Sequence, residues 1–370
     1  MKFCLDARTA TGHFPGIGRY VSNLAREMAD QLSGGERLIV VRDPAGAGRW
    51  KLPATRPGVV SVVESTASPF GLGQQFAIPR LLRGSRTEVY HSPYYLMPYR
   101  PGVPTVVTIY DLIPQHFPEY VSARARLLFQ AATRLALAAA RQVITISEAS
   151  RRDLLAAYRL PPERVTAIPL APDPRFRLQP QEEIARVREK YALAAYVLYV
   201  GINKPHKNLV RLLEAWQRVE SEAVLVIAGA WDERYSQPKR RAAALGLGER
   251  VRFLGPVDDG DLPGLYAGAR LFVFPSRYEG FGLPVIEAMA CGAPVACANT
   301  SSLPEVAGEA AVLFDPQDTQ GMAEAMQSVL ESSDGRSVLQ ERGLEQAARF
   351  SWARTAAETL AVYRMLGDAA

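Results

Sequence analysis

The chain has 370 residues, of which 48% are hydrophobic and 22% are charged. This composition is typical of a folded globular protein and excludes a disordered or collagen-like chain, while the length favours two domains. Residues 1–180 carry 23 Lys and Arg against 13 Asp and Glu, a net charge of +10, and the remainder carry 20 against 25, a net charge of −5. The basic half suits an anionic membrane surface or a lipid-phosphate acceptor, or it is simply an arginine-rich solvated surface. No basic motif interleaved with aromatic residues supports nucleic-acid binding.

The cysteine content and the ends of the chain bear on the compartment. Cys4, Cys291 and Cys297 are too few for a disulfide framework or a zinc cluster, and they favour a reducing compartment. Residues 2–7 resemble a strand rather than a secretory signal, and the most apolar helical stretch, 127–140, is too short to cross a membrane. We therefore expect a cytoplasmic protein whose only membrane contact is peripheral, on the inner face of the cytoplasmic membrane.

The first half alternates predicted strands and helices. Strands are expected at 2–7, 38–41, 59–63, 88–91, 105–111, 143–147 and 165–170, and helices at about 17–32, 74–82, 119–141 and 148–158. Ser147 is placed as the N-cap of the last of these helices. Strands that alternate with helices in this way indicate a doubly wound parallel sheet. The glycine turn 16–18 before the first helix lacks the third glycine of a dinucleotide fingerprint, so NAD binding is discounted.

A proline-rich stretch, residues 169–180, interrupts this series, and we place the interdomain linker there. A second series follows, with strands at 196–201, 223–229, 251–254, 271–275, 294–298 and 311–314, helices at 208–219, 238–245 and 283–290, and three terminal helices. The expected domains are 1–175 and 176–350, with a C-terminal helix in 351–370 packing back on the first domain. Two doubly wound sheets in tandem bind ligands at the carboxyl ends of their strands, in the cleft between them.

The stretch 278–289 joins a buried strand to a helix through a glycine loop. Gly280 and Gly282 allow the backbone to approach a ligand, and the helix that starts at Leu283-Pro284 offers free N–H groups to an anion. Glu279 and Glu287 frame this anion site with carboxylates. A ligand with phosphate at one end and hydroxyl groups at the other, such as a sugar nucleotide, fits the combination.

The block 274–295 resembles the signature of the retaining glycosyltransferases of family four, in which seven residues separate two glutamates. Supporting similarity lies at 16–20, 143–154, 201–209 and 304–316, so the resemblance covers nearly the whole chain. It implies a GT-B fold, in which two facing Rossmann-like domains enclose a cleft, with the acceptor on the first domain and a nucleotide sugar on the second. Within the family, Asp6-Ala7-Arg8, residues 108–114 and Lys207-Asn208 resemble bacterial mannosyltransferases of surface-polysaccharide assembly, which favours GDP-mannose as donor.

The resemblance also implies roles for individual residues. Glu287 would bind the nucleotide ribose, Glu279 the donor sugar near its reacting carbon, and Lys207 the departing diphosphate, without a metal. The expected donor-binding set is Gly16, Gly18, Arg19, Lys204, Lys207, Glu279, Gly280, Phe281, Gly282, Leu283 and Glu287. Tyr110 and Asp111 are expected to contact the acceptor, and Glu279, Asp111 and Lys207 are the catalytic candidates. Structural alternatives stay open: a helix-dipole carboxylate at 287, a loop-ordering one at 279, an exposed helix lysine at 207 and a turn residue at 111.

The sequence departs from the family pattern at two positions. Ile202 stands where many members carry arginine after the glycine, and Lys204, His206 or Arg19 are the candidate replacements. Tyr110 stands where members often carry histidine, and a tyrosine can donate a hydrogen bond but is a poor base at neutral pH. These departures keep a non-catalytic sugar-nucleotide-binding subunit open as an alternative, beside a transferase that uses a UDP-sugar and a GT-B epimerase. His91 and His116 are expected to be structural residues rather than metal ligands.

Overall fold

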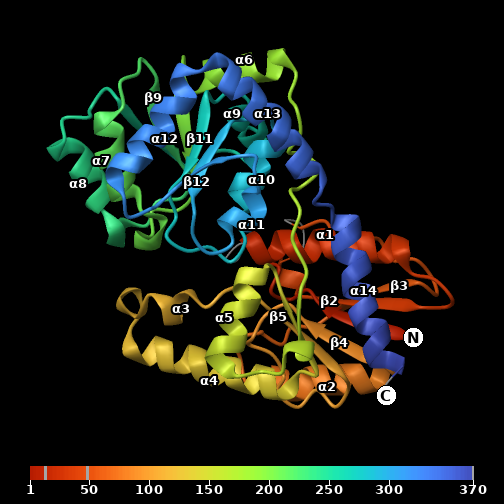
Figure 1. Cartoon of the computed structure of the whole chain (residues 1–370). Helices are drawn as coiled ribbons and strands as arrows, with labels where there is room; N and C mark the ends of the chain where they lie inside the picture. Colours follow the sequence, from red (N-terminus) through yellow and green to blue (C-terminus); the bar gives the residue numbers. More distant parts are fainter. Residues whose placement is uncertain (12–14, 47–49, 369–370) are drawn as a thin grey trace. The chain divides into compact units, whose positions relative to one another are not determined.

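The computed structural model describes residues 1–11, 15–46 and 50–368, which form two compact units. Unit 1 comprises residues 1–170 and 351–370, and unit 2 comprises residues 171–350. The described part of the chain carries one parallel sheet of seven strands in unit 1 and one of six strands in unit 2, each flanked by helices (Figure 1). This is the doubly wound α/β architecture that the alternation of strands and helices predicts.

The sheet of unit 1 has the strand order β3-β2-β1-β4-β5-β6-β7, and every neighbouring pair is parallel. Its strands are β1 (Lys2–Asp6), β2 (Arg37–Arg42), β3 (Val60–Glu64), β4 (Val89–Ser92), β5 (Thr105–Ile109), β6 (Gln142–Thr145) and β7 (Val165–Ala167). Its helices are α1 (Pro15–Gln31), α2 (Gln74–Ser85), α3 (Ile113–His116), α4 (Ala123–Ala139), α5 (Glu148–Tyr158) and α14 (Trp352–Asp368). The chain order reverses direction at β1, so the carboxyl ends of β1 and β4 form the switch point at which open α/β sheets bind ligands.

The sheet of unit 2 has the order β10-β9-β8-β11-β12-β13 and is also parallel throughout. Its strands are β8 (Tyr196–Val200), β9 (Val224–Ala228), β10 (Val251–Gly255), β11 (Leu271–Phe274), β12 (Val295–Ala298) and β13 (Val312–Phe314). Its helices are α6 (Gln181–Lys190), α7 (Leu209–Arg218), α8 (Gln237–Ala244), α9 (Leu262–Ala267), α10 (Leu283–Ala290), α11 (Leu303–Ala307), α12 (Thr319–Glu331) and α13 (Ser333–Ala348). Here β8 and β11 lie at the switch point, and both strands are buried.

The structure corrects the sequence analysis at two helices. The helix expected from residue 119 begins at Ala123, because Ser122 caps it by accepting a hydrogen bond from Ala125 N, and residues 118–120 form a separate 3-10 turn. Helix α6 directly after the proline-rich stretch was not predicted. By contrast, Ser147 is confirmed as the N-cap of α5, where its hydroxyl accepts from Ser150 N.

The C-terminal helix α14 belongs to unit 1 and packs against α1. Arg364 makes two hydrogen bonds to the Glu36 carboxylate, of 2.7 and 2.8 Å, and Thr355 Oγ1 donates to Pro169 O over 2.8 Å. Within the fold, the Tyr363 hydroxyl lies 2.6 Å from His91 Nδ1, and His91 Nε2 lies 2.8 Å from Thr108 Oγ1. Both ring nitrogens of the buried His91 are therefore occupied by hydroxyl groups, as a structural histidine requires.

Burial lowers the pKa of His91 from 6.5 to about 3. The unfolded chain therefore takes up a proton at this histidine at a higher pH than the folded chain does. The stability that the neutral imidazole contributes is complete above pH 6.5 and is lost as the pH falls toward 3. We expect His91 to account for a loss of about 2 kcal/mol in the free energy of unfolding between pH 7 and pH 5.

Urea unfolding at a series of pH values, on the wild type and on His91→Gln, measures this effect. The wild type should lose stability in that interval, and the variant should lose about 2 kcal/mol less. Equal losses in the two proteins would contradict the assignment to His91. The exposed His116, which lies 3.2 Å from Asp153 Oδ2, serves as the control histidine for His116→Gln.

Candidate active site

The site in unit 2 is built where β11 ends. The strand delivers Pro275 and Ser276 to its carboxyl end, and a loop then leads through Glu279 and Gly282 into α10, which begins at Leu283. Gly282 has φ = 106°, a left-handed conformation that favours glycine, and a Cβ atom there would lie 2.7 Å from Leu303 Cδ2. The glycine therefore allows both the turn and the close packing of the loop on α11.

The start of α10 retains free donors. Pro284 has no N–H group, and Val285 N donates to Gly282 O, which leaves the N–H groups of Gly282 and Leu283 at the helix start. Together with the positive end of the helix dipole, these two groups can bind an anion.

Glu279 is joined to Lys207 from a distant part of the sequence. Lys207 Nζ lies 2.6 Å from Glu279 Oε1, and both side chains are largely buried, with 16% and 11% of their surface exposed. The ammonium also lies 5.5 Å from the centre of the Phe274 ring. Lys207 is the last residue of the 3-10 turn Pro205–Lys207 after β8, so the contact joins the carboxyl ends of the two central strands, β8 and β11. The structure thus brings together two residues that the sequence analysis treated separately.

A hydroxyl-rich turn after β12 fixes the loop that carries Glu279. Ser301 Oγ accepts from Glu279 N over 2.9 Å, and Ser302 Oγ donates to Glu279 O and Phe281 O over 3.0 and 2.7 Å. The Ser276 hydroxyl donates to the Glu279 carboxylate itself. These serines were missed by the sequence analysis, although the carboxyl ends of neighbouring parallel strands always adjoin, and residues 299–302 directly follow a predicted strand.

Glu287 lies in the second turn of α10 and is 4% exposed. The Tyr266 hydroxyl donates to Glu287 Oε2 over 3.4 Å. A carboxylate in this place can accept two hydrogen bonds from a diol. The neighbouring Phe281 ring packs against Phe350 at 5.7 Å between ring centres.

Ile202 stands where many family members carry an arginine, and two of the candidate replacements, Lys204 and His206, lie in unit 2 and differ in charge. Desolvation, with the charges of Lys207, Lys204 and Arg277, lowers the pKa of His206 to about 3, so this buried histidine is neutral. Lys204 is exposed in the same loop. Arg277 is a further cation near His206: its backbone N–H donates to His206 O over 2.8 Å, and its charge helps to lower the pKa of His206. The sequence analysis gave it no role. With His206 neutral, Lys204 is the remaining candidate in unit 2 for the missing arginine.

The candidates in unit 1 lie on α1 and after β5. Gly16, Gly18 and Arg19 belong to the first turns of α1, so the expected glycine turn at 16–18 is wrong: Pro15 already starts the helix there. A Cβ atom at Gly18 would lie 2.2 Å from the Trp50 indole, so this glycine allows a close approach rather than a turn.

Tyr110 and Asp111 follow β5. The Tyr110 hydroxyl is buried without a hydrogen-bond partner, while its ring packs edge-on against Tyr20 at 5.6 Å. Burial raises the pKa of Tyr110 well above 10, so the hydroxyl stays protonated and is a donor rather than a base. Asp111 Oδ1 accepts from Ile113 N over 3.0 Å, which is consistent with the turn alternative.

Unit 1 also contains a cavity of about 370 Å³ near the carboxyl ends of β1 and β2. Its lining includes Ala7, Arg42, Asp43, Trp50 and Thr55. A cavity of this size with aromatic, charged and hydroxyl groups is large enough for one or two sugar rings. No group of three or more His, Cys, Asp or Glu side chains suited to a metal ion occurs within residues 1–11, 15–46 and 50–368.

Comparison with known proteins decides the family. The model described as Glycosyltransferase Family 4 matches residues 15–176, and the model described as Glycosyl transferases group 1 matches residues 180–346. This chain belongs to glycosyltransferase family 4. The two matched segments correspond to the two sheets, so each half of the family's architecture is present in this family 4 chain.

Individual relatives agree with this assignment. The chain is 35% identical to O-antigen chain mannosyltransferase B of Escherichia coli over 77% of its own length and 76% of that protein. It is 32% identical to the serotype-specific mannosyltransferase WbdA of Escherichia coli over 58% of its length, but this match spans only 27% of that larger protein. Among solved structures, HepE of Anabaena in complex with UDP and glucose superimposes with a TM-score of 0.76 at 20% identity, covering 99% of this chain and 100% of that one. The likeness confirms the GT-B fold.

Proposed function

We propose that this glycosyltransferase moves mannose from GDP-mannose, with retention at the anomeric carbon, onto a lipid-linked or growing glycan of a cell-surface polysaccharide. The observation that carries the proposal is the contact between Lys207 and Glu279 beside the free N–H groups of Gly282 and Leu283. It combines positive charge for a diphosphate with a carboxylate for a sugar. Similarity to two mannosyltransferases supports mannose as the transferred sugar.

In the proposed reaction, the acceptor hydroxyl forms a bond to the anomeric carbon while the bond to the nucleotide diphosphate breaks. The departing phosphate oxygen takes the proton of the acceptor hydroxyl, so the enzyme needs no strong base. The protonated state of Tyr110 is compatible with this route, because this residue can donate a hydrogen bond but cannot accept the proton. Lys207 and the start of α10 stabilise the charge that develops on the diphosphate, and we propose that they do so without a metal.

Different residues between Glu279 and Glu287 are proposed to bind different parts of the donor. We propose that Glu287 accepts hydrogen bonds from the ribose, Gly280, Phe281, Gly282 and Leu283 surround the diphosphate, and Glu279 holds the sugar. Lys204, Gly16, Gly18 and Arg19 remain proposed contacts of the donor. Tyr110 and Asp111 are proposed to contact the acceptor, together with the cavity beside Trp50.

A thermal-shift panel of GDP, UDP, ADP and their sugar conjugates, with EDTA or with magnesium, tests the donor. A ligand present at a hundred times its dissociation constant should stabilise the wild type by about 2.7 kcal/mol. We expect GDP and GDP-mannose to do so in EDTA. For Glu287→Gln we expect roughly 10- to 100-fold weaker binding of the nucleotide, because a charge-assisted hydrogen bond contributes about 1.5–3 kcal/mol.

The panel separates the alternatives. Glu309→Gln, an exposed change in the same unit, is the matched control and should respond like the wild type. A preference for UDP would mean that the donor is a UDP-sugar, while the proposed type of reaction would stay the same. An unchanged response of Glu287→Gln would contradict its ribose role. A non-catalytic subunit is favoured by Ile202 and Tyr110, and nucleotide binding without turnover of any donor would support it.

A further inference from the structure

Large apolar side chains are exposed on unit 1 in two segments. Phe70 and Leu72, in the turn before α2, and Phe76, in its first turn, are 54%, 84% and 79% exposed. Leu127, Leu128 and Leu135 on α4 are 64%, 59% and 51% exposed. They are six of the eleven large hydrophobic residues found exposed in the part of the chain that the structure describes. Single exposed hydrophobic residues are ordinary, but clusters of them mark interaction surfaces.

Helix α4 has two apolar faces. Phe129, Ala136 and Leu137 point into the core, as the sequence predicts for a covering helix. Arg124, Leu127, Leu128, Ala131, Arg134, Leu135 and Ala138 form a second stripe at helical spacing, and all of them are exposed. The leucines of this outer stripe keep more than half of their surface exposed to water, so the hydrophobic effect favours covering them.

The two segments lie on the same face of the sheet. Ile78 and Leu82 of α2 belong to the same core cluster as the buried residues of α4, and Figure 1 shows both helices along the lower edge of unit 1. The loop after β4 connects them: Gln75 is hydrogen-bonded to Met97 and Tyr99, and the Tyr95 ring packs on Phe129 at 5.0 Å.

Two half-buried tyrosines lie in this connection, next to the exposed Phe70. The Tyr94 and Tyr95 hydroxyls are 3.0 Å apart, and the Phe70 ring lies 6.5 Å from the Tyr94 ring. Tyrosines with an apolar ring and a polar tip are enriched at the boundary between water and lipid.

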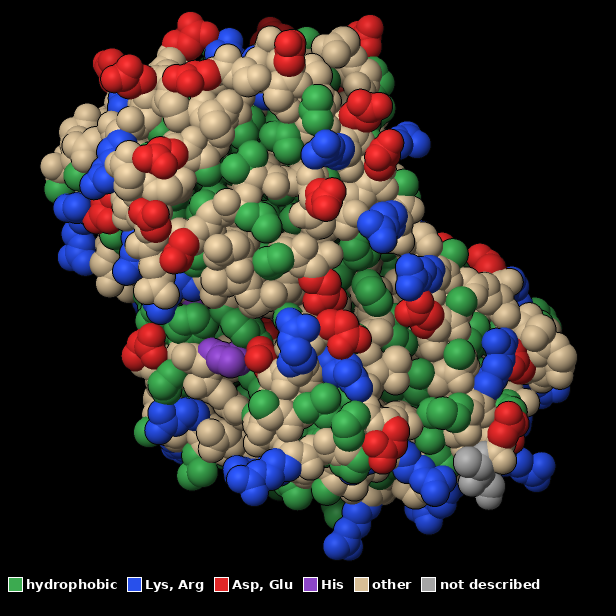
Figure 2. Space-filling model, viewed as in Figure 1, with side chains coloured by type: hydrophobic (Ala, Val, Ile, Leu, Met, Phe, Trp, Pro, Cys, Tyr) green, Lys and Arg blue, Asp and Glu red, His purple; other side chains and the backbone are tan. Residues whose placement is uncertain are grey.

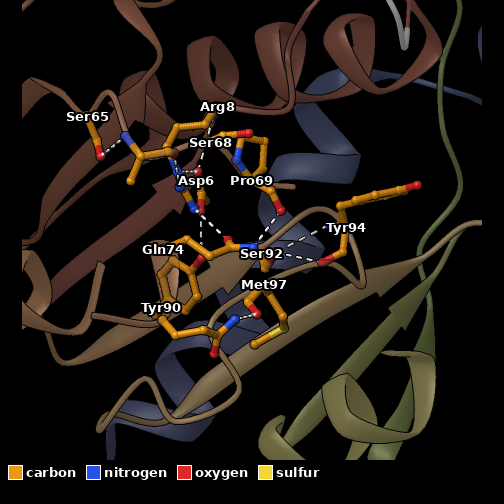
Figure 3. A network of polar contacts seen from close by, with 12 residues as sticks. Asp6, Arg8, Ser65, Ser68, Pro69, Gln74, Tyr90, Ser92, Tyr94 and Met97 are labelled. Carbon is orange, nitrogen blue, oxygen red and sulfur yellow. Dashed lines mark hydrogen bonds and ion pairs between the residues drawn. The ribbon is translucent and has the colours of Figure 1, made fainter. Parts of the chain in front are cut away.

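A buried ion pair fixes the segment that carries Phe70 and Leu72. Arg8 binds both oxygens of Asp6 over 2.6 and 2.8 Å, and both residues are almost fully buried. The same guanidinium donates to Ala67 O over 2.6 Å and to Gln74 Oε1 over 3.3 Å, and Tyr90 donates to Asp6 Oδ2 (Figure 3). The exposed aromatic and leucine side chains therefore project from a segment that is held at both ends.

Within the two segments that carry the exposed apolar side chains, all the charged residues have the same sign. Residues 65–87 contain Arg80, Arg83 and Arg86 and no acidic residue, and residues 120–147 contain Arg124, Arg126, Arg134 and Arg141 and no acidic residue. These segments therefore contribute +7 to the basic first half of the chain. Figure 2 shows Lys and Arg side chains beside hydrophobic ones along this lower edge of unit 1. A protein partner or a second copy would bury the leucines equally well, but an anionic lipid surface also matches a set of arginines that have no acidic neighbours in sequence.

We propose that the surface formed by residues 70–76, the loop 94–100 and the outer stripe of α4 binds the interface of an anionic lipid bilayer. The leucines and Phe76 enter the boundary between headgroups and acyl chains, the tyrosines lie at that boundary, and the arginines bind lipid phosphates. No helix in the described ranges is long and apolar enough to cross a membrane. The proposal rests on the proposed function in one respect only, because a lipid-linked acceptor is presented at such a surface.

Sedimentation of the whole protein with vesicles of phosphatidylglycerol and phosphatidylcholine, at low salt and without donor or acceptor, tests the proposal. The wild type should sediment with these vesicles and much less with pure phosphatidylcholine, and added salt should weaken the binding. Leu127→Gln/Leu128→Gln and Arg124→Gln/Arg134→Gln should each bind roughly tenfold or more weakly. The matched controls are Met365→Gln, an equally exposed apolar residue on α14, and Arg240→Gln in unit 2, which should bind like the wild type.

Three outcomes would overturn the proposal: no binding to the anionic vesicles, binding that the α4 variants leave unchanged, or self-association in the absence of lipid that the α4 variants abolish. The last outcome would identify the surface as an interface between copies. Because all four substituted residues of α4 are exposed, the unfolding midpoints should stay close to that of the wild type. The variants should also keep the nucleotide-induced thermal shift, so failure of lipid binding and failure of the proposed function are separate results.

Discussion

Replacing Lys207 by methionine should lower kcat by about 10²–10³-fold with a smaller effect on the KM for the donor. Methionine keeps the length and apolar stem of the side chain, including its place beside the Phe274 ring, and removes only the charge. The negative charge on the diphosphate grows as its bond to the sugar breaks, so the loss falls mainly on the transition state. Steady-state kinetics with saturating acceptor measures both constants.

The neighbouring Lys204 provides the control for this experiment. It is exposed, whereas Lys207 is largely buried, so Lys204→Met should change kcat far less. An equal loss in the two variants would show that the loop carries a shared positive charge, with Lys204 in place of the arginine missing at position 202. A kcat within about threefold of the wild type for Lys207→Met would contradict its proposed role.

Glu279→Gln is the second change with a large expected effect, a decrease in kcat of about 10²-fold. Glutamine keeps an oxygen that can accept the hydrogen bond from Ser276, so the loop should remain folded. The charge that holds Lys207 at 2.6 Å and that would favour positive charge on the sugar is lost. The measurement is kcat together with the unfolding midpoint, because a residue that merely orders the loop would alter the midpoint more than the turnover.

The two changes should not be additive. Residues in direct contact share an interaction energy, so the double variant Lys207→Met/Glu279→Gln should lose less activity than the product of the two single losses. Additive losses would mean that the two side chains act on separate parts of the substrate, and the short contact between them would then have no role in turnover.

Local patterns in the sequence contain much of the fold and part of the site. The strand, glycine loop and helix from residue 271 to residue 290 were predictable, since a buried apolar run, a glycine pair and a proline after the loop each have a local cause. The contact between Lys207 and Glu279 was not, because 72 residues separate them and only the strand order of the sheet places β8 beside β11. The contacts of Ser301 and Ser302 with the Glu279 loop were not predictable for the same reason, since they depend on β12 lying beside β11.

Other features depended on packing that a one-dimensional pattern does not contain. Gly18 was interpreted as part of a turn. In the structure, a glycine is needed there because the indole of Trp50 lies against α1 and leaves no room for a side chain. The sequence predicted the helix α4, but it could not reveal that leucines on its outer face stay exposed. Periodicity shows that a helix has an apolar side, and only the folded chain shows how many of its sides are covered.

The most direct test of the account is a transfer reaction with isotopically labelled GDP-mannose and a lipid-linked glycan acceptor, in EDTA, with the anomeric configuration of the product read by NMR. We predict a mannosylated product that keeps the α-configuration of the donor, and far less of it from Lys207→Met. A product of inverted configuration, or donor binding without any product across donors and acceptors, would contradict the account.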